Sequence, residues 1–71
     1  MDRAVERFGE NLRAARKAKG WTQEELAYES GLAPVQVSRI ERGVREIRLT
    51  TLLRLVAALE TSPDELTHGL F

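Results

Sequence analysis

The sequence has no cysteine, few aromatic residues and no long apolar run. The absence of cysteine excludes disulfides, thiolate metal sites and cysteine nucleophiles, and it is typical of a reducing compartment. The longest strongly apolar run, residues 55–59, is too short to cross a bilayer. The first residues carry charges of both signs and do not resemble a secretory signal. We therefore expect a cytoplasmic protein with no membrane partner.

Charge of one sign is also missing, because eleven basic and eleven acidic residues cancel. The composition therefore does not indicate a strongly basic nucleic-acid binder. The charges are nevertheless sorted along the chain. Residues 1–20 and 33–48 are net basic, whereas residues 21–32 and 49–71 are net acidic. A chain sorted in this way can present one basic face despite its neutral total.

Helix signals recur along the whole chain, and no alternating strand pattern is present. Apolar residues at three- and four-residue spacing, together with capping residues and glycine stops, predict five helices. Their expected ranges are about 3–19, 22–29, 33–42, 49–59 and 62–67. Thr22 with Glu25, and Ser62 with Glu65, are expected to form capping boxes. The sequence predicts an all-α fold, a compact five-helix bundle that forms a single domain over residues 1–71.

The last third of the chain contains two sets of apolar residues that are expected to be covered by other parts of the protein or by a partner. The inner face of the helix at 49–59 is expected to carry Leu49, Leu52, Leu53, Val56 and Leu59. The residues Leu66, Leu70 and Phe71 either close the core or form a dimer interface, and both interpretations are open. A domain of this size often gains stability from a partner subunit.

The second and third predicted helices are separated by a turn of only three residues, 30–32, which contains a glycine. Two short helices joined in this way cross steeply, which predicts a helix-turn-helix over about residues 22–42. With Val37 placed in the core, the opposite face of the third helix has small, apolar or basic side chains and no acid. Its members are Val35, Ser38, Arg39 and Arg42, flanked by Pro34 and Gln36. Such a face suits the major groove, where an arginine can donate two hydrogen bonds to guanine.

Several motifs together carry a family resemblance over roughly residues 8–67. They are the segments 22–27, 30–32, 37–43, 49–55, 58–59 and 62–66. This combination resembles the lambda-repressor/Cro (XRE-type) helix-turn-helix regulators. The small size and the Arg-x-Ile-x-Leu loop that starts at Arg45 are loosely similar to controller proteins of restriction–modification systems. The resemblance implies a lambda-repressor-like fold and a sequence-specific transcriptional regulator that binds double-stranded DNA as a homodimer on a palindromic operator.

The resemblance also implies roles for individual residues. The positions that read bases are Pro34, Val35, Gln36, Ser38 and Arg39. The positions that contact phosphates are Thr22, Gln23, Arg42, Arg45 and Arg48. Arg16 and Glu41 match a structural ion pair between the first and third helices. Ala33 and Pro34 depart from the polar residues of most relatives, so the family's preferred base sequence does not transfer to this chain.

The remaining function classes have little support in the sequence. There is no serine–histidine–acid set and no glycine-rich phosphate loop, so we do not expect an enzyme. His68 is the single histidine, and neither a metal, a cofactor nor a small-molecule ligand is expected. The competing hypothesis is a protein-interaction module of the same fold, such as an antitoxin-like partner. RNA binding is disfavoured by the lack of an aromatic stacking surface.

Overall fold

Five helices make up most of residues 3–70, which are the residues that the computed structural model describes. They are α1 (Arg3–Ala18), α2 (Gln23–Ser30), α3 (Pro34–Glu41), α4 (Leu49–Leu59) and α5 (Pro63–Thr67). Every helix end lies within one residue of its expected position, and no strand occurs within this range. The predicted all-α five-helix fold is confirmed. No helix between residues 3 and 70 is long and apolar enough to cross a membrane.

The helices begin and end where local chemistry directs them. At α2, Thr22 Oγ1 accepts a hydrogen bond from the Glu25 backbone N–H at 3.1 Å, and the Glu25 carboxylate accepts one from the Thr22 N–H at 2.8 Å. This is the predicted capping box. At α5, Ser62 Oγ accepts from the Glu65 N–H at 3.2 Å. No return bond from Ser62 to the Glu65 carboxylate occurs among the described residues, so the second box is only half formed.

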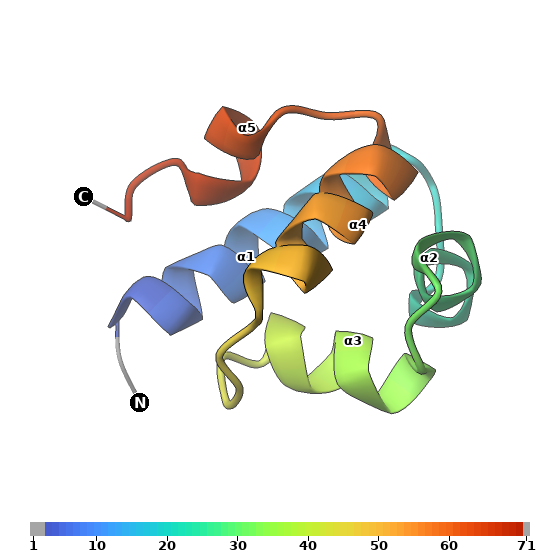
Figure 1. The fold of residues 1–71 in the computed structure, drawn as a ribbon, viewed down its shortest axis with the longest axis horizontal. Coiled ribbons are helices and arrows are strands. Elements are labelled where there is room, and N and C mark those ends of the chain that lie inside the picture. The colour runs from blue at the N-terminus through green and yellow to red at the C-terminus, as the bar shows by residue number, and fades with distance from the viewer. Residues whose placement is uncertain (1–2, 71) are drawn as a thin grey trace.

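The core draws side chains from all five helices. Its buried apolar members are Phe8, Leu12, Leu26, Ala27, Val37, Ile40, Leu55, Leu59 and Leu66. Figure 1 shows α1 passing behind α4, with α5 above it, α3 below it and α2 at one end. Because α1 contacts both α3 and α5, it holds the helix-turn-helix and the C-terminal helix in one body.

A glycine on α1 allows α3 to approach unusually closely. Gly9 is buried, and a Cβ placed there would lie 2.4 Å from the Ile40 carbonyl oxygen and 2.7 Å from that of Glu41. Real Cβ atoms do not approach backbone so closely, so only glycine fits without moving one of the helices. Gly9 therefore fixes the distance between α1 and the C-terminal end of α3.

The inner face of α4 differs from the prediction. Leu55 and Leu59 are buried, and Leu52 and Val56 are half-buried, whereas Leu49 is 71% and Leu53 is 55% exposed. The prediction for Leu49 and Leu53 is wrong because α4 is apolar on more than one face. Packing against α2 and α5 selects the face centred on Leu55, which leaves the neighbouring leucines in solvent.

The C-terminal segment is held against α1 by hydrogen bonds. The Asn11 side-chain amide donates to the Leu66 and His68 carbonyl oxygens at 2.9 and 2.8 Å, and Arg7 Nε donates to the latter at 3.2 Å. Leu66 has no exposed surface, so its placement in a dimer interface is wrong and it closes the core instead. Leu70 is half-buried against the core, and Phe71 lies outside the described residues.

Candidate nucleic-acid interface

The turn between α2 and α3 sets the crossing of the two helices. Gly31 ends α2 with a φ of 75°, a left-handed conformation that glycine adopts at little cost, and its N–H donates to the Ala27 carbonyl. Pro34 then starts α3, where a backbone N–H is not needed. Ala33 has no side chain that could cap α3, but Gln36 Oε1 accepts from the Ala33 N–H at 2.8 Å. This bond partly replaces the missing cap.

The outward face of α3 stands open to solvent as the helical geometry predicts. Val37 and Ile40 point into the core, whereas Val35 is 51% exposed and Arg39 and Arg42 are also exposed. Ser38 is half-buried, and its carbonyl accepts a hydrogen bond from Arg42 Nε at 3.4 Å. The exposed residues expected to flank this face are Pro34 and Gln36. The side chains of this face are small, apolar or basic, which permits close approach to another molecule.

A buried ion pair fixes the C-terminal end of α3 to α1. Arg16 Nε donates to Glu41 Oε2 at 2.7 Å and Arg16 Nη2 donates to Glu41 Oε1 at 3.0 Å, as expected from the resemblance. Arg16 Nη1 also donates to the Trp21 carbonyl at 2.7 Å. The hydrogen bonds to Glu41 raise the pKa of Arg16 above its ordinary value, despite the opposing effect of burial. Both groups are satisfied, so the pair positions α3 and is not available to a ligand.

Gln23 joins this network from the start of α2. It is half-buried, and its Nε2 donates to Glu41 Oε1 at 3.1 Å. Its side chain is therefore already engaged within the protein. Its backbone N–H lies in the first turn of α2, where N–H groups have no partner within the helix and favour an anion. Thr22 lies beside it and is exposed.

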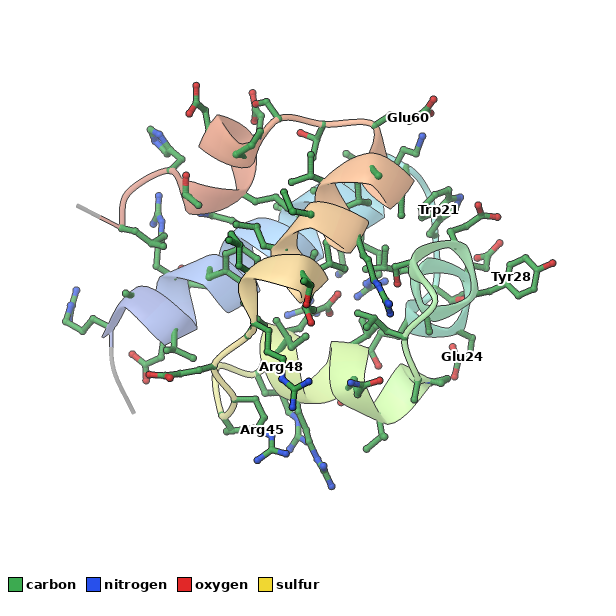
Figure 2. The ribbon with its side chains drawn as sticks, in the orientation of Figure 1. Trp21, Glu24, Tyr28, Arg45, Arg48 and Glu60 are labelled. Atoms are coloured by element: carbon green, nitrogen blue, oxygen red, sulfur yellow. The ribbon has the colours of Figure 1, made fainter. Side chains whose placement is uncertain are left out.

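The loop from α3 to α4 is basic and projects on the α3 side of the molecule. Figure 2 shows Arg45 and Arg48 beside α3, whereas Glu24 and Tyr28 lie along the outer side of α2. Arg48 is the N-cap of α4, its side chain makes no capping hydrogen bond, and the first turn of α4 has no acid. A cation at a helix N-terminus opposes the helix dipole, so this end of α4 is suited to a bound anion.

The acidic residue Glu25 and the aromatic residue Trp21 have structural roles. Glu25 is engaged in the capping box. Trp21 is half-buried against the core, and Lys19 Nζ lies 5.0 Å from its ring centroid.

Among the residues described, no three histidine, aspartate or glutamate side chains gather as a metal site would require.

Arg54 is a candidate that the sequence analysis did not single out. It is exposed on α4 and lines a groove together with Arg39, Arg45 and Arg48. The sequence feature that could have pointed to Arg54 is its spacing from Thr50, because residues four positions apart lie on the same face of a helix. It is also the only lysine or arginine after residue 48.

Comparison with known proteins gives consistent results. A family model described as "Helix-turn-helix" (HTH_3) matches residues 12–66. The crystal structure of the restriction–modification controller protein C.AhdI from Aeromonas hydrophila is 43% identical, with a TM-score of 0.88 over 92% of this chain and 98% of that one. The P22 c2 repressor in complex with synthetic operator 9T is 39% identical, with a TM-score of 0.80 over 87% of this chain and 94% of that one.

A curated relative is considerably longer than this chain. The "hypothetical transcription factor" of Neisseria meningitidis is 41% identical over 56 residues, which are 79% of this chain and 53% of the relative. The chain thus spans about half the length of that protein.

Proposed function

Because the chain belongs to this helix-turn-helix family, we propose that it is a sequence-specific transcriptional regulator that binds double-stranded DNA as a homodimer. The family is a class of DNA-binding regulators and not of enzymes. Such a regulator acts where the DNA is, which for this chain we take to be the cytoplasm. The proposal makes α3 the recognition helix, which enters the major groove.

The observation that carries this proposal is the open outward face of α3. Val35, Arg39 and Arg42 are exposed and carry no acid among them. The residues proposed to contact bases are Pro34, Val35, Gln36, Ser38 and Arg39. Arg39 has the reach and the paired donors for guanine, and Val35 can contact a thymine methyl group.

Groups on either side of α3 hold the DNA backbone in this proposal. The residues proposed to contact phosphates are Thr22, Gln23, Arg42, Arg45 and Arg48. At α2 the donor is the Gln23 backbone N–H, because the side chain of that residue is hydrogen-bonded to Glu41. At α4 the first-turn N–H groups act with Arg48, which caps no group of its own helix. Contacts of this kind set the register on the duplex and do not read sequence.

The dimer surface is proposed on α4. Leu49 and Leu53 lie four residues apart on one face, and both are more than half exposed. Exposed leucines at this spacing form an apolar strip that a second copy would cover. Leu70, which is half-buried at the C-terminal end, is proposed to border this surface. A two-fold dimer would read a palindromic operator whose half-sites are about 34–36 Å apart.

Selection of bound duplexes from a random pool tests the function directly. We expect a palindromic site whose two halves are separated by about one helical turn, or about 10 base pairs. The affinity for this site should fall steeply as salt rises, in proportion to the number of phosphates contacted. An empty selection at low salt would refute the proposal.

A second candidate function is a protein-interaction module of the same fold, such as an antitoxin-like partner. The observation that favours it is Tyr28, which is 85% exposed on α2 beside the exposed acids Glu24 and Glu29. Such a surface would repel DNA but could contact a protein. The duplex selection separates the two functions, because a module that contacts only a protein would select no duplex.

A further inference from the structure

An open groove of about 770 Å³ runs between α3 and α4. We refer to it as the α3–α4 groove. Arginines from three segments line it, namely Arg39 of α3, Arg45 and Arg48 of the loop, and Arg54 of α4, and Glu46 is the one acid among the described residues that line it. Figure 2 shows the side chains of Arg45 and Arg48 on this side of the molecule. The groove therefore concentrates positive charge in a protein whose total charge is zero.

The four arginines of the α3–α4 groove have no internal partner. Between residues 3 and 70, none of them donates a side-chain hydrogen bond or forms an ion pair. Some other cations between residues 3 and 70 are engaged within the protein. Arg16 is paired with Glu41, Lys19 with Glu60 at 2.9 Å, and Arg7 with the His68 carbonyl. Among residues 3–70 no ion pair neutralises these four arginines, and Glu46 is the single acid that lines the groove with them, so the groove is suited to an anionic chain.

Arg54 lines the α3–α4 groove beside the turn between α2 and α3. Its Nη1 is 4.0 Å from the Cβ position of Gly31, so its side chain reaches from α4 to the turn that precedes α3. Arg45 and Arg48 follow the opposite end of α3 in sequence and line the same groove. Positive charge therefore accompanies α3 along its length, on one flank.

We propose that Arg54 is a further contact to the DNA backbone, which binds a phosphate of the strand that lies in the α3–α4 groove. This proposal rests on the proposed function, because it requires α3 to occupy the major groove. A recognition helix is bordered by a sugar–phosphate strand on each flank, and Arg54 stands on the flank of α3 and not on its outward face. Its contribution is to affinity, and it is the same for every DNA sequence.

The test compares charge variants of Arg54 in the salt dependence of binding. Arg54→Gln keeps a long side chain and removes the charge, Arg54→Lys keeps the charge, and Arg45→Gln is the variant at a phosphate contact proposed above. Lys17→Gln is the matched control, since Lys17 is exposed on the side of α1 opposite the buried Leu12. Affinity is measured for the selected operator and for an unrelated duplex at 50 to 200 mM salt.

We expect Arg54→Gln to reduce the slope of log affinity against log salt by about 0.9 per protomer, or about 1.8 for a dimer. The advantage of the wild type over the variant then shrinks by about 12-fold from 50 to 200 mM salt. The weakening should be equal on both duplexes. Arg54→Lys and Lys17→Gln should keep the wild-type slope, whereas Arg45→Gln should reduce it.

A scan of single methylphosphonate substitutions locates the contact. At one position in each half-site, removing the phosphate charge should weaken the wild type but leave Arg54→Gln unaffected, and that position should differ from the one found for Arg45→Gln. All variants are first shown to melt at the wild-type temperature, and Arg54→Ala replaces Arg54→Gln if that variant melts lower.

Two different failures can be told apart. A wild-type slope for the neutral Arg54 variants, or no phosphate whose effect they mask, overturns the Arg54 proposal while operator binding stands. If the wild type itself selects no duplex, the proposed function fails and the Arg54 contact fails with it.

Discussion

Replacement of Gly9 by alanine tests whether the close approach of α1 and α3 holds α3, the proposed recognition helix, in place. The new Cβ would lie 2.4 Å from the Ile40 carbonyl oxygen and 2.7 Å from that of Glu41. An ordinary contact needs about 3.4 Å, so one helix must shift by up to about 1 Å against a close-packed core. Overpacking of this kind costs about 1–3 kcal/mol, and backbone atoms cannot rotate away as a side chain would.

The helix propensity of alanine works in the opposite direction. Alanine is better than glycine in a helix interior by about 1 kcal/mol, so the net loss at Gly9 is expected to be up to about 2 kcal/mol. For a domain of this size a loss of that size lowers Tm by up to about 16 °C. Ala14→Gly, at an exposed position of the same helix, measures the propensity effect alone.

Thermal and urea unfolding of both variants is the assay. In Gly9→Ala the end of α3 that carries Glu41 would be displaced. Operator affinity should therefore also fall in this variant, but not in Ala14→Gly. A Gly9→Ala protein more stable than the wild type by the full propensity difference that Ala14→Gly measures would show that the two helices separate freely. The assignment of Gly9 as the element that fixes their distance would then be wrong.

Three other predictions concern base readout, assembly and pH. Arg39→Ala should lose discrimination at one base position by about 1–3 kcal/mol in binding to operator variants; equal weakening on all sequences would make Arg39 a phosphate contact. Leu53→Glu should convert a dimer to a monomer in light scattering while Tyr28→Ser does not, and an unchanged mass for Leu53→Glu would remove α4 from the interface. The hydrogen bond and charge of Lys19 lower the pKa of Glu60 below its ordinary value of 4.5. The folded protein therefore binds that proton less readily than the unfolded chain. The pair stabilises the fold above pH 4.5, and this contribution is lost as pH falls through the lowered pKa. The Tm difference between wild type and Glu60→Gln should close in that range, and a constant difference would contradict the assignment.

Local signals were sufficient for most of the helix boundaries. The Thr22 capping box and the Gly31 stop act within a few residues, so the sequence contains all that determines them. The exposed face of α3 follows for the same reason, because Val37 in the core fixes the direction of every other side chain of that helix.

Features that depend on packing between distant segments were not predictable in the same way. Most residues of α4 are apolar, so periodicity could not choose between Leu53 and Leu55 for the core. That choice depends on how α2 and α5 lie against α4. The close approach of Gly9 to Ile40 and the reach of Arg54 to the turn at Gly31 both join segments more than 20 residues apart in sequence.

The network of Arg16, Gln23 and Glu41 has a consequence for how the protein would meet its target. It joins α1, α2 and α3 through four hydrogen bonds, one of them to the Trp21 carbonyl, at the C-terminal end of α3. The helix α3 is thus held in one orientation before a complex forms, and little conformational entropy remains to be lost on complex formation. A protein that holds its binding helix in this way rejects a poorly matched site, because the helix has little freedom to adapt to it.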